Sequence, residues 1–191
     1  MRAIVIVIAL LDALLGAGRP AAADCEAIRA RLAADSTRAH QWNLAWGLGF
    51  TGATVLQAAI AVTPISEVQR DAMIVGAAKS GIGMIVHAIL PLRIATPTSC
   101  AEADAIQVKA GRDERRLFFL NHLGGLALNL AGAVILSERH SLREGAISFA
   151  LGWPIGLLHA YTLPRSSWHA VRSITAMPYQ GGALLTVAGL F

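Results

Sequence analysis

The chain has 191 residues, of which 55% are hydrophobic and 15% are charged, and its formal net charge is +4. An ordinary soluble domain carries about 25% charged residues, so this composition excludes that class and predicts a membrane protein. The basic residues are scattered over separate segments, which is typical of contact with lipid headgroups and argues against a nucleic-acid partner.

The N-terminal residues 1–23 have the pattern of a secretory signal peptide. Arg2 gives the positive start, residues 3–15 form the apolar stretch, and the alanines at 21–23 form a small-residue cleavage site. We expect cleavage after Ala23, which leaves residues 24–191 as one membrane domain. An uncleaved signal anchor is the alternative, because an aspartate interrupts the apolar stretch.

Four later segments are long and apolar enough to cross a bilayer as helices. A helix needs about 20 apolar residues to span a hydrocarbon core of about 30 Å. The four segments are residues 44–63, 72–92, 117–136 and 145–163. The predicted fold class is therefore all-α, a polytopic membrane protein with four transmembrane helices. Short surface helices are expected over 24–41 and 101–110, with a loop over 93–116 between the second and third spans.

The second and fourth spans end alike, which suggests a duplicated helical hairpin. Each reaches a His-Ala pair near its end and then stops at a proline and an arginine, from His87 to Arg93 and from His159 to Arg165. Internal repeats are common in membrane proteins. The alternative is coincidence, because proline and arginine are an ordinary way to end a span at the interface.

Both cysteines, Cys25 and Cys100, are expected to form a disulfide. Two predicted spans separate them, so they lie on the same side of the membrane in either orientation. The signal peptide places this side, and both ends of the mature chain, outside a bacterial-type inner membrane. The positive-inside rule opposes this orientation, because most basic residues then lie outside, and the inverted orientation stays open.

Three histidines lie at nearly the same inferred depth. His87 and His159 come about one turn before the outer ends of their spans, His122 about one turn after the start of its span, and His40 about a turn higher. Imidazoles commonly bind transition metals. One hypothesis is therefore a metal site formed by His87, His122 and His159, with His40 as a further ligand. A second is a b-type haem held by His87 and His159; the alternative to both is ordinary helix packing.

Other polar side chains in the spans are Lys79, Asn121 and Asn129. A lysine near the membrane centre costs about 2.5–3.5 kcal/mol, and the span interiors contain no acidic residue to pair with it. We expect Lys79 to reach the interface along its helix or to contact Asn129 or Gln57. Asn121 and Asn129 are expected to orient the histidine rings. The tryptophans at 42, 46 and 168 are expected to anchor the bundle at the interface.

The sequence contains no phosphate-binding loop, no nucleophile elbow and no facing carboxylate pair, and Asp113 with Glu114 reads as a solvated helix start. Whether the chain is an enzyme stays open. The prediction is a non-catalytic inner-membrane component whose partners are the lipid bilayer and other membrane subunits or a second copy of itself. A metal- or haem-binding redox protein is the alternative, and a small-solute transporter is the third.

Overall fold

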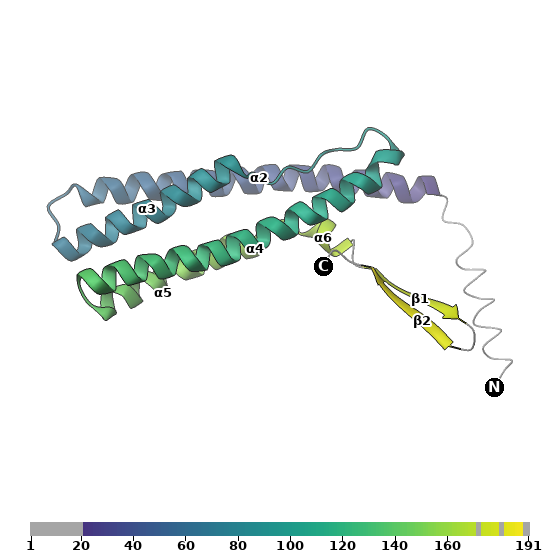
Figure 1. Ribbon diagram of the computed structural model, residues 1–191. Coiled ribbons are helices and arrows are strands. Elements are labelled where there is room, and N and C mark those ends of the chain that lie inside the picture. The colour runs from purple at the N-terminus through teal and green to yellow at the C-terminus, as the bar shows by residue number, and fades with distance from the viewer. Residues whose placement is uncertain (1–20, 171–172, 180–181, 189–191) are drawn as a thin grey trace.

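The computed structural model describes residues 21–170, 173–179 and 182–188, and side chains over 25–169. These residues form helices α2 (Ala21–Ala61), α3 (Glu67–Ile89), α4 (Cys100–Arg139), α5 (Leu142–Tyr161) and the short α6 (Ser166–Ala170), as Figure 1 shows. The antiparallel strands β1 (Ser173–Tyr179) and β2 (Gly182–Ala188) follow, with Ser173 opposite Ala188. The predicted all-α class is confirmed for the bundle, and the C-terminal hairpin is the departure from it.

The bundle consists of two helical hairpins lying side by side (Figure 1). Helix α2 packs against α3, and α4 packs against α5; α4 also contacts α2 and α3, which joins the hairpins. Ser66 caps α3 by accepting a hydrogen bond from the backbone N–H of Gln69 at 3.3 Å, and Ser141 caps α5 through Glu144 at 3.4 Å. These are the two units that the predicted duplication requires, while the duplication itself stays a prediction.

Helices α2 and α4 are much longer than the spans predicted inside them. The predicted surface helix over 24–41 is continuous with the first span in α2, which has 41 residues. The helix expected over 101–110 likewise continues into the third span in α4, which has 40 residues. The predicted loop over 93–116 was therefore too long, because no proline lies within α4 to end the helix. Each of these helices extends about 60 Å, roughly twice the thickness of the hydrocarbon core.

Three helices are long and apolar enough to cross a membrane: Cys25–Ala61, Glu67–Ile89 and Cys100–Arg139. Helix α5 is not among them: its 20 residues are long enough, but they include Arg143 and Glu144 near its start and His159 near its end. The fourth span therefore stays a prediction, supported by the packing of α5 along α4. The predicted signal peptide lies almost wholly outside the described residues and stays a prediction too.

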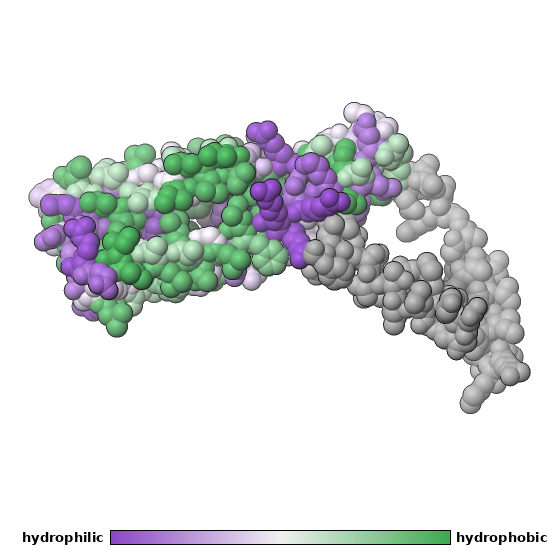
Figure 2. Space-filling view, viewed as in Figure 1, coloured by the Kyte–Doolittle hydropathy of each residue, from purple (hydrophilic) through white to green (hydrophobic). Residues whose placement is uncertain are grey.

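An apolar surface surrounds the middle of the bundle. Figure 2 shows hydrophobic residues over the central part of one face, with hydrophilic residues toward either end. Large apolar side chains point outward from the four long helices, among them Leu48, Val55, Ile85, Val134 and Leu151, which are 65%, 63%, 53%, 58% and 69% exposed. A surface of this kind is stable only in contact with lipid or protein, and together with helices of spanning length it is compatible with a membrane protein.

One end of the bundle carries the predicted disulfide, and we call it the cysteine end. Cys25 and Cys100 are bonded, with their Cα atoms 5.5 Å apart, which confirms the prediction. The main buried apolar cluster lies near this end and comprises Leu32, Ala39, Trp42, Leu92, Ile94, Ala110, Phe118, Ala160, Leu163 and Trp168. Trp42 and Trp168 are 8% and 7% exposed, so they are core residues, and their prediction as interface anchors was wrong.

A buried carboxylate fixes α6 to α4 at the cysteine end. Glu114 is 0% exposed and accepts backbone hydrogen bonds from Trp168 at 2.7 Å and Ser167 at 3.4 Å. Its interpretation as a solvated helix start was therefore wrong. Burial raises the pKa of Glu114 to about 7, the negative charge of Asp35 adds to the rise, and the two backbone N–H groups oppose it. Asp35 is buried as well and pairs with Arg38.

The opposite end of the bundle, which we call the Asp71 end, joins the two hairpins through an ionic contact. Oδ2 of Asp71 in α3 lies 3.1 Å from Nε of Arg139 and 3.0 Å from Nε2 of His140, just after α4. Asp71 is buried. The hairpins are therefore tied together near both ends, by the disulfide at one and by Asp71 at the other.

Candidate functional site

Polar side chains of the spans meet in the interior between the hairpins. Lys79 of α3 donates from Nζ to Oδ1 of Asn129 in α4 at 3.2 Å and to Oγ of Ser148 in α5 at 3.3 Å. The predicted contact with Asn129 is confirmed, and the alternative in which Lys79 reaches the interface was wrong. Gln57 of α2 is bound to a different residue of α3: its Oε1 atom accepts a hydrogen bond from the hydroxyl of Ser80 at 3.5 Å.

Glycines make room for this interior group. A Cβ atom on Gly132 would lie 3.0 Å from Cδ of Lys79 and 3.0 Å from Cγ1 of Val75, and one on Gly152 would lie 3.0 Å from Nζ of Lys79. The Cα atom of Gly156 would lie only 3.7 Å from a Cβ on Gly125. Small residues at these positions let α4 approach α3 and α5 closely, as membrane helices commonly require.

The buried face of α4 includes Asn121 rather than His122. Asn121 and Asn129 are 9% and 7% exposed and lie two four-residue steps apart, with Gly125 between them. His122 lies at the edge of this face and is partly exposed. At about 100° per residue, the seven-residue spacing places His122 and Asn129 on nearly the same side of a helix, so spacing alone does not decide which of residues 121 and 122 is buried, and the packing of α5 against α4 does.

His87 of α3 and His159 of α5 come together across the two hairpins. Their ring centroids are 5.7 Å apart, and the two residues are 8% and 9% exposed. Nε2 of His87 donates to the backbone oxygen of Asn43 at 2.8 Å. Nε2 of His159 is buried and has no hydrogen-bond partner in the described part of the chain. The inferred equality of depth was therefore correct for this pair.

Aromatic side chains of α2 surround the pair. The indole of Trp42 lies 4.9 Å from the His159 ring and nearly parallel to it, with an interplanar angle of 9°, and 5.0 Å from the His87 ring. Trp46 and Phe50 contact His159 at 4.8 and 5.1 Å. The histidine pair therefore lies in a mostly apolar shell closed by α2.

The other two predicted histidine ligands lie elsewhere. His122 packs among Phe118, Trp153 and Tyr161, with ring centroids 5.8, 5.5 and 5.9 Å away. His40 is exposed on α2. Among the residues that the structure describes, no group of three or more His, Cys, Asp or Glu side chains is arranged to hold a metal ion. The structure thus brings together His87 and His159 and leaves His122 and His40 apart from them.

A b-type haem does not fit between the paired histidines as they lie here. A haem iron would sit between the two rings, and its porphyrin would extend sideways from that axis. The indole of Trp42 is within 5.0 Å of both rings while the rings are 5.7 Å apart, so it occupies the space beside the axis. Trp42 would have to leave the core before a porphyrin could enter.

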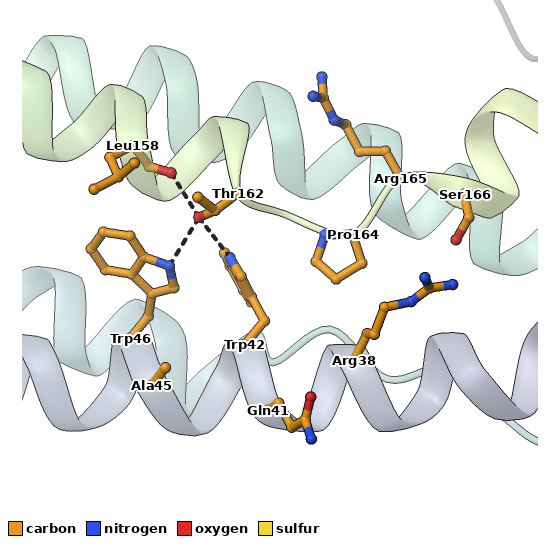
Figure 3. Close-up of a pocket in the computed structure, with 10 residues that line it drawn as sticks. All are labelled: Arg38, Gln41, Trp42, Ala45, Trp46, Leu158, Thr162, Pro164, Arg165 and Ser166. Atoms are coloured by element: carbon orange, nitrogen blue, oxygen red, sulfur yellow. Dashed lines mark hydrogen bonds between the residues drawn. The ribbon is translucent and has the colours of Figure 1, made fainter.

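A pocket of about 590 Å³ opens beside this shell toward the cysteine end. Figure 3 shows the residues that line it. The indole N–H groups of Trp42 and Trp46 both donate to Oγ1 of Thr162, at 3.2 and 3.1 Å, and the hydroxyl of Thr162 donates to the carbonyl of Leu158 at 2.7 Å. The same two indoles contact His159. They therefore form a shared wall between the pocket and the histidine pair.

Sequence reasoning missed the residues of α2 that complete this region. Trp42, Phe50 and the backbone of Asn43 contact the histidine pair, although no pattern along the chain links them to it. The four-residue spacing of Trp42, Trp46 and Phe50 was the available signal, because it places the three side chains on one face of a helix.

Comparison of the chain with family models, with curated proteins and with solved structures finds no match.

Proposed function

We propose that this chain is a non-catalytic component of a bacterial-type inner membrane, a bundle of four membrane-spanning helices whose cysteine end engages a partner subunit. The observation that carries the proposal is that polar side chains within the spans bind each other. Lys79 binds Asn129 and Ser148, and Ser80 binds Gln57. These contacts hold helices together, which is the usual role of polar residues inside membrane bundles.

The disulfide supports the proposed orientation. Disulfides form and persist in oxidising compartments, so the bond between Cys25 and Cys100 favours a cysteine end on the outer side. The N-terminal part of α2 and the first part of α4 then extend beyond the bilayer together with α6. In an outward-facing extension of this kind, a rigid helical surface is available to another subunit or to a second copy of the chain.

A small-solute transporter has less support from the contacts. Lys79 would be its intramembrane charge, but two donors of the ammonium group are already bound to Asn129 and Ser148. Substitution of Lys79 by methionine would abolish transport if the residue bound a solute. In a packing role it changes stability only.

The test is site-specific photo-crosslinking in native membranes. A photoreactive residue at Arg112, exposed on α4 toward the cysteine end, is compared with one at Glu138, exposed on α4 near the Asp71 end. The proposal predicts a discrete cross-linked product from position 112 and none from position 138. A product of twice the monomer mass identifies the partner as a second copy. Absence of any product at 112, or equal products at both positions, overturns the assignment of the partner to the cysteine end.

A further inference from the structure

The histidine pair stands out from the other polar groups of the bundle. Nε2 of His159 has no hydrogen-bond partner among the described residues and is enclosed by aromatic rings. Buried nitrogens of Asn121 and His122 are also without a partner there, but the ring of His159 lies beside that of a second histidine, His87. A buried polar atom without a partner costs about 1–3 kcal/mol. The arrangement is therefore unfavourable for packing alone and indicates a missing ligand.

The separation of the two rings suits a shared metal ion. Imidazole nitrogens bind a transition metal at about 2.0–2.1 Å, and the ring centre lies roughly 1 Å farther back, so two imidazoles on one ion have centroids about 6 Å apart. The observed value is 5.7 Å. The two side chains come from different hairpins, so such an ion would bridge α3 and α5.

The hydrogen bond of His87 provides the second independent feature. Because a carbonyl only accepts, the contact at 2.8 Å places the proton of the ring on Nε2 and leaves the lone pair on Nδ1. Metal-binding histidines commonly donate their other N–H to a backbone carbonyl in this way, which fixes the tautomer that can bind. His159 offers Nε2 without any competing partner within the described residues.

The surroundings of the two histidines favour an ion with a single positive charge. The rings of Trp42, Trp46 and Phe50, the carbonyl of Asn43 and the backbone at Gly47 lie around the pair, and no ion pair to either histidine is found among the described residues. An uncompensated charge in an apolar site is costly, and a divalent ion costs more than a monovalent one. An ion between the rings also lies within about 6 Å of the Trp42 indole, the range of cation–π attraction. Among the metals that imidazole binds, the monovalent one is Cu⁺.

We propose that His87 and His159 bind one Cu⁺ ion beneath Trp42. This inference goes beyond the proposed role as a membrane component and does not depend on it. The pocket bounded by Trp42, Trp46 and Thr162 lies on the cysteine-end side of the pair, and the indoles of Trp42 and Trp46 separate it from the two histidines. His122 and His40 take no part in this site.

The test uses the full chain, purified in mild detergent and freed of metal with a chelator. Cu⁺ is titrated anaerobically in competition with a chromophoric Cu⁺ chelator, and Ag⁺ serves as a redox-inert probe of the same site. The expected result is one equivalent bound, with quenching of tryptophan fluorescence. His87→Gln and His159→Gln should each weaken binding at least 100-fold, and His122→Gln, at a similar depth on α4, should leave it unchanged.

X-ray absorption at the copper edge of the unmodified protein is the second measurement and needs no variant to fold. Two nitrogen ligands at about 2 Å are expected. Sulfur ligands in that spectrum, no stoichiometric binding, or unchanged affinity in the folded His87→Gln and His159→Gln proteins would each overturn the proposal. Equal loss of affinity in His122→Gln would overturn it too, and so would Zn²⁺ binding as tightly as Cu⁺.

Discussion

The indole N–H of Trp42 donates to the hydroxyl of Thr162 at 3.2 Å, although 120 positions separate the two residues in the sequence. The same oxygen accepts from Trp46 at 3.1 Å. One hydroxyl at the C-terminal end of α5 therefore fixes two side chains of α2, and with them the wall between the pocket and the histidine pair.

Removal of the Thr162 hydroxyl should destabilise the cysteine end of the bundle. Thr162→Val keeps the shape of the side chain but leaves two indole N–H groups without an acceptor, so we expect a loss of about 1–2 kcal/mol in the free energy of unfolding. Thr162→Ser keeps the oxygen and should lose much less. Thermal unfolding in detergent, followed by tryptophan fluorescence, measures both. A loss in Thr162→Ser as large as that in Thr162→Val would show that keeping the hydroxyl does not preserve stability and would contradict this account.

Gly152→Ala should weaken the contact between α5 and the interior group. A methyl group at this position would overlap the amide of Asn129 and crowd Nζ of Lys79, and overpacking of this kind costs about 1–3 kcal/mol. Gly124→Ala is the matched control, because nothing lies within 4 Å of its Cβ position. The control should be neutral or stabilising by up to about 1 kcal/mol. A control variant as unstable as Gly152→Ala would show that the loss is not due to packing.

Asn129→Leu should be more harmful than Lys79→Met. The asparagine variant leaves a half-buried ammonium group with one acceptor in place of the two that it now has, whereas the lysine variant removes the charge itself. We expect a loss of about 1–3 kcal/mol for Asn129→Leu and a smaller one for Lys79→Met. The double variant, measured by the same unfolding assay, should resemble Lys79→Met, because the two side chains are coupled. Simple addition of the two losses would mean that the hydrogen bond contributes nothing.

Loss of the disulfide should destabilise the chain through either cysteine. The bond joins residues 75 positions apart, and closing a loop of that length contributes about 2–4 kcal/mol. Cys25→Ser, Cys100→Ser and the double variant should therefore have the same lowered unfolding temperature, and a reducing agent should lower that of the unmodified protein alone. A further decrease in the reduced single variants would contradict this account.

The raised pKa of Glu114, about 7, should make the stability of the cysteine end depend on pH. Between the ordinary value of 4.5 and 7, the unfolded chain releases this proton while the folded chain retains it. Rising pH therefore favours the unfolded state over this interval, by up to about 3 kcal/mol, with no further change from this group above it. Glu114→Gln should flatten the profile of unfolding free energy against pH. A profile that rises from pH 4.5 to 7 in the unmodified protein and is unchanged by Glu114→Gln would contradict the assignment.

Several features of the bundle could be predicted because they depend on local patterns alone. The apolar runs over 44–63 and 72–92 lie mostly within helices that can cross a membrane, and the run over 117–136 lies wholly within one. Cys25 and Cys100 could be paired by counting the spans between them. The depth of His87 and His159 followed from the rise of a helix, which is the same in every sequence.

The sequence predicted less reliably which side of each helix faces the interior of the bundle. A shift of one residue turns a helix by about 100°, and that difference separates the buried Asn121 from the partly exposed His122. Which of the two faces the interior depends on where α5 lies against α4, and the sequence of α4 does not contain that information. The same holds for Glu114, whose burial depends on α6 lying over it.

The sequence by itself predicted a membrane protein of apolar helices with its cysteines on one side, because length, hydropathy and helix rise act along the chain. Only the tertiary structure decided that His87 meets His159 beneath Trp42 while His122 lies apart, and that Lys79 is held by Asn129. These contacts join α2, α3, α4 and α5, and they depend on how two hairpins rotate and approach each other. That relation is set by close packing at glycines such as Gly132 and Gly152.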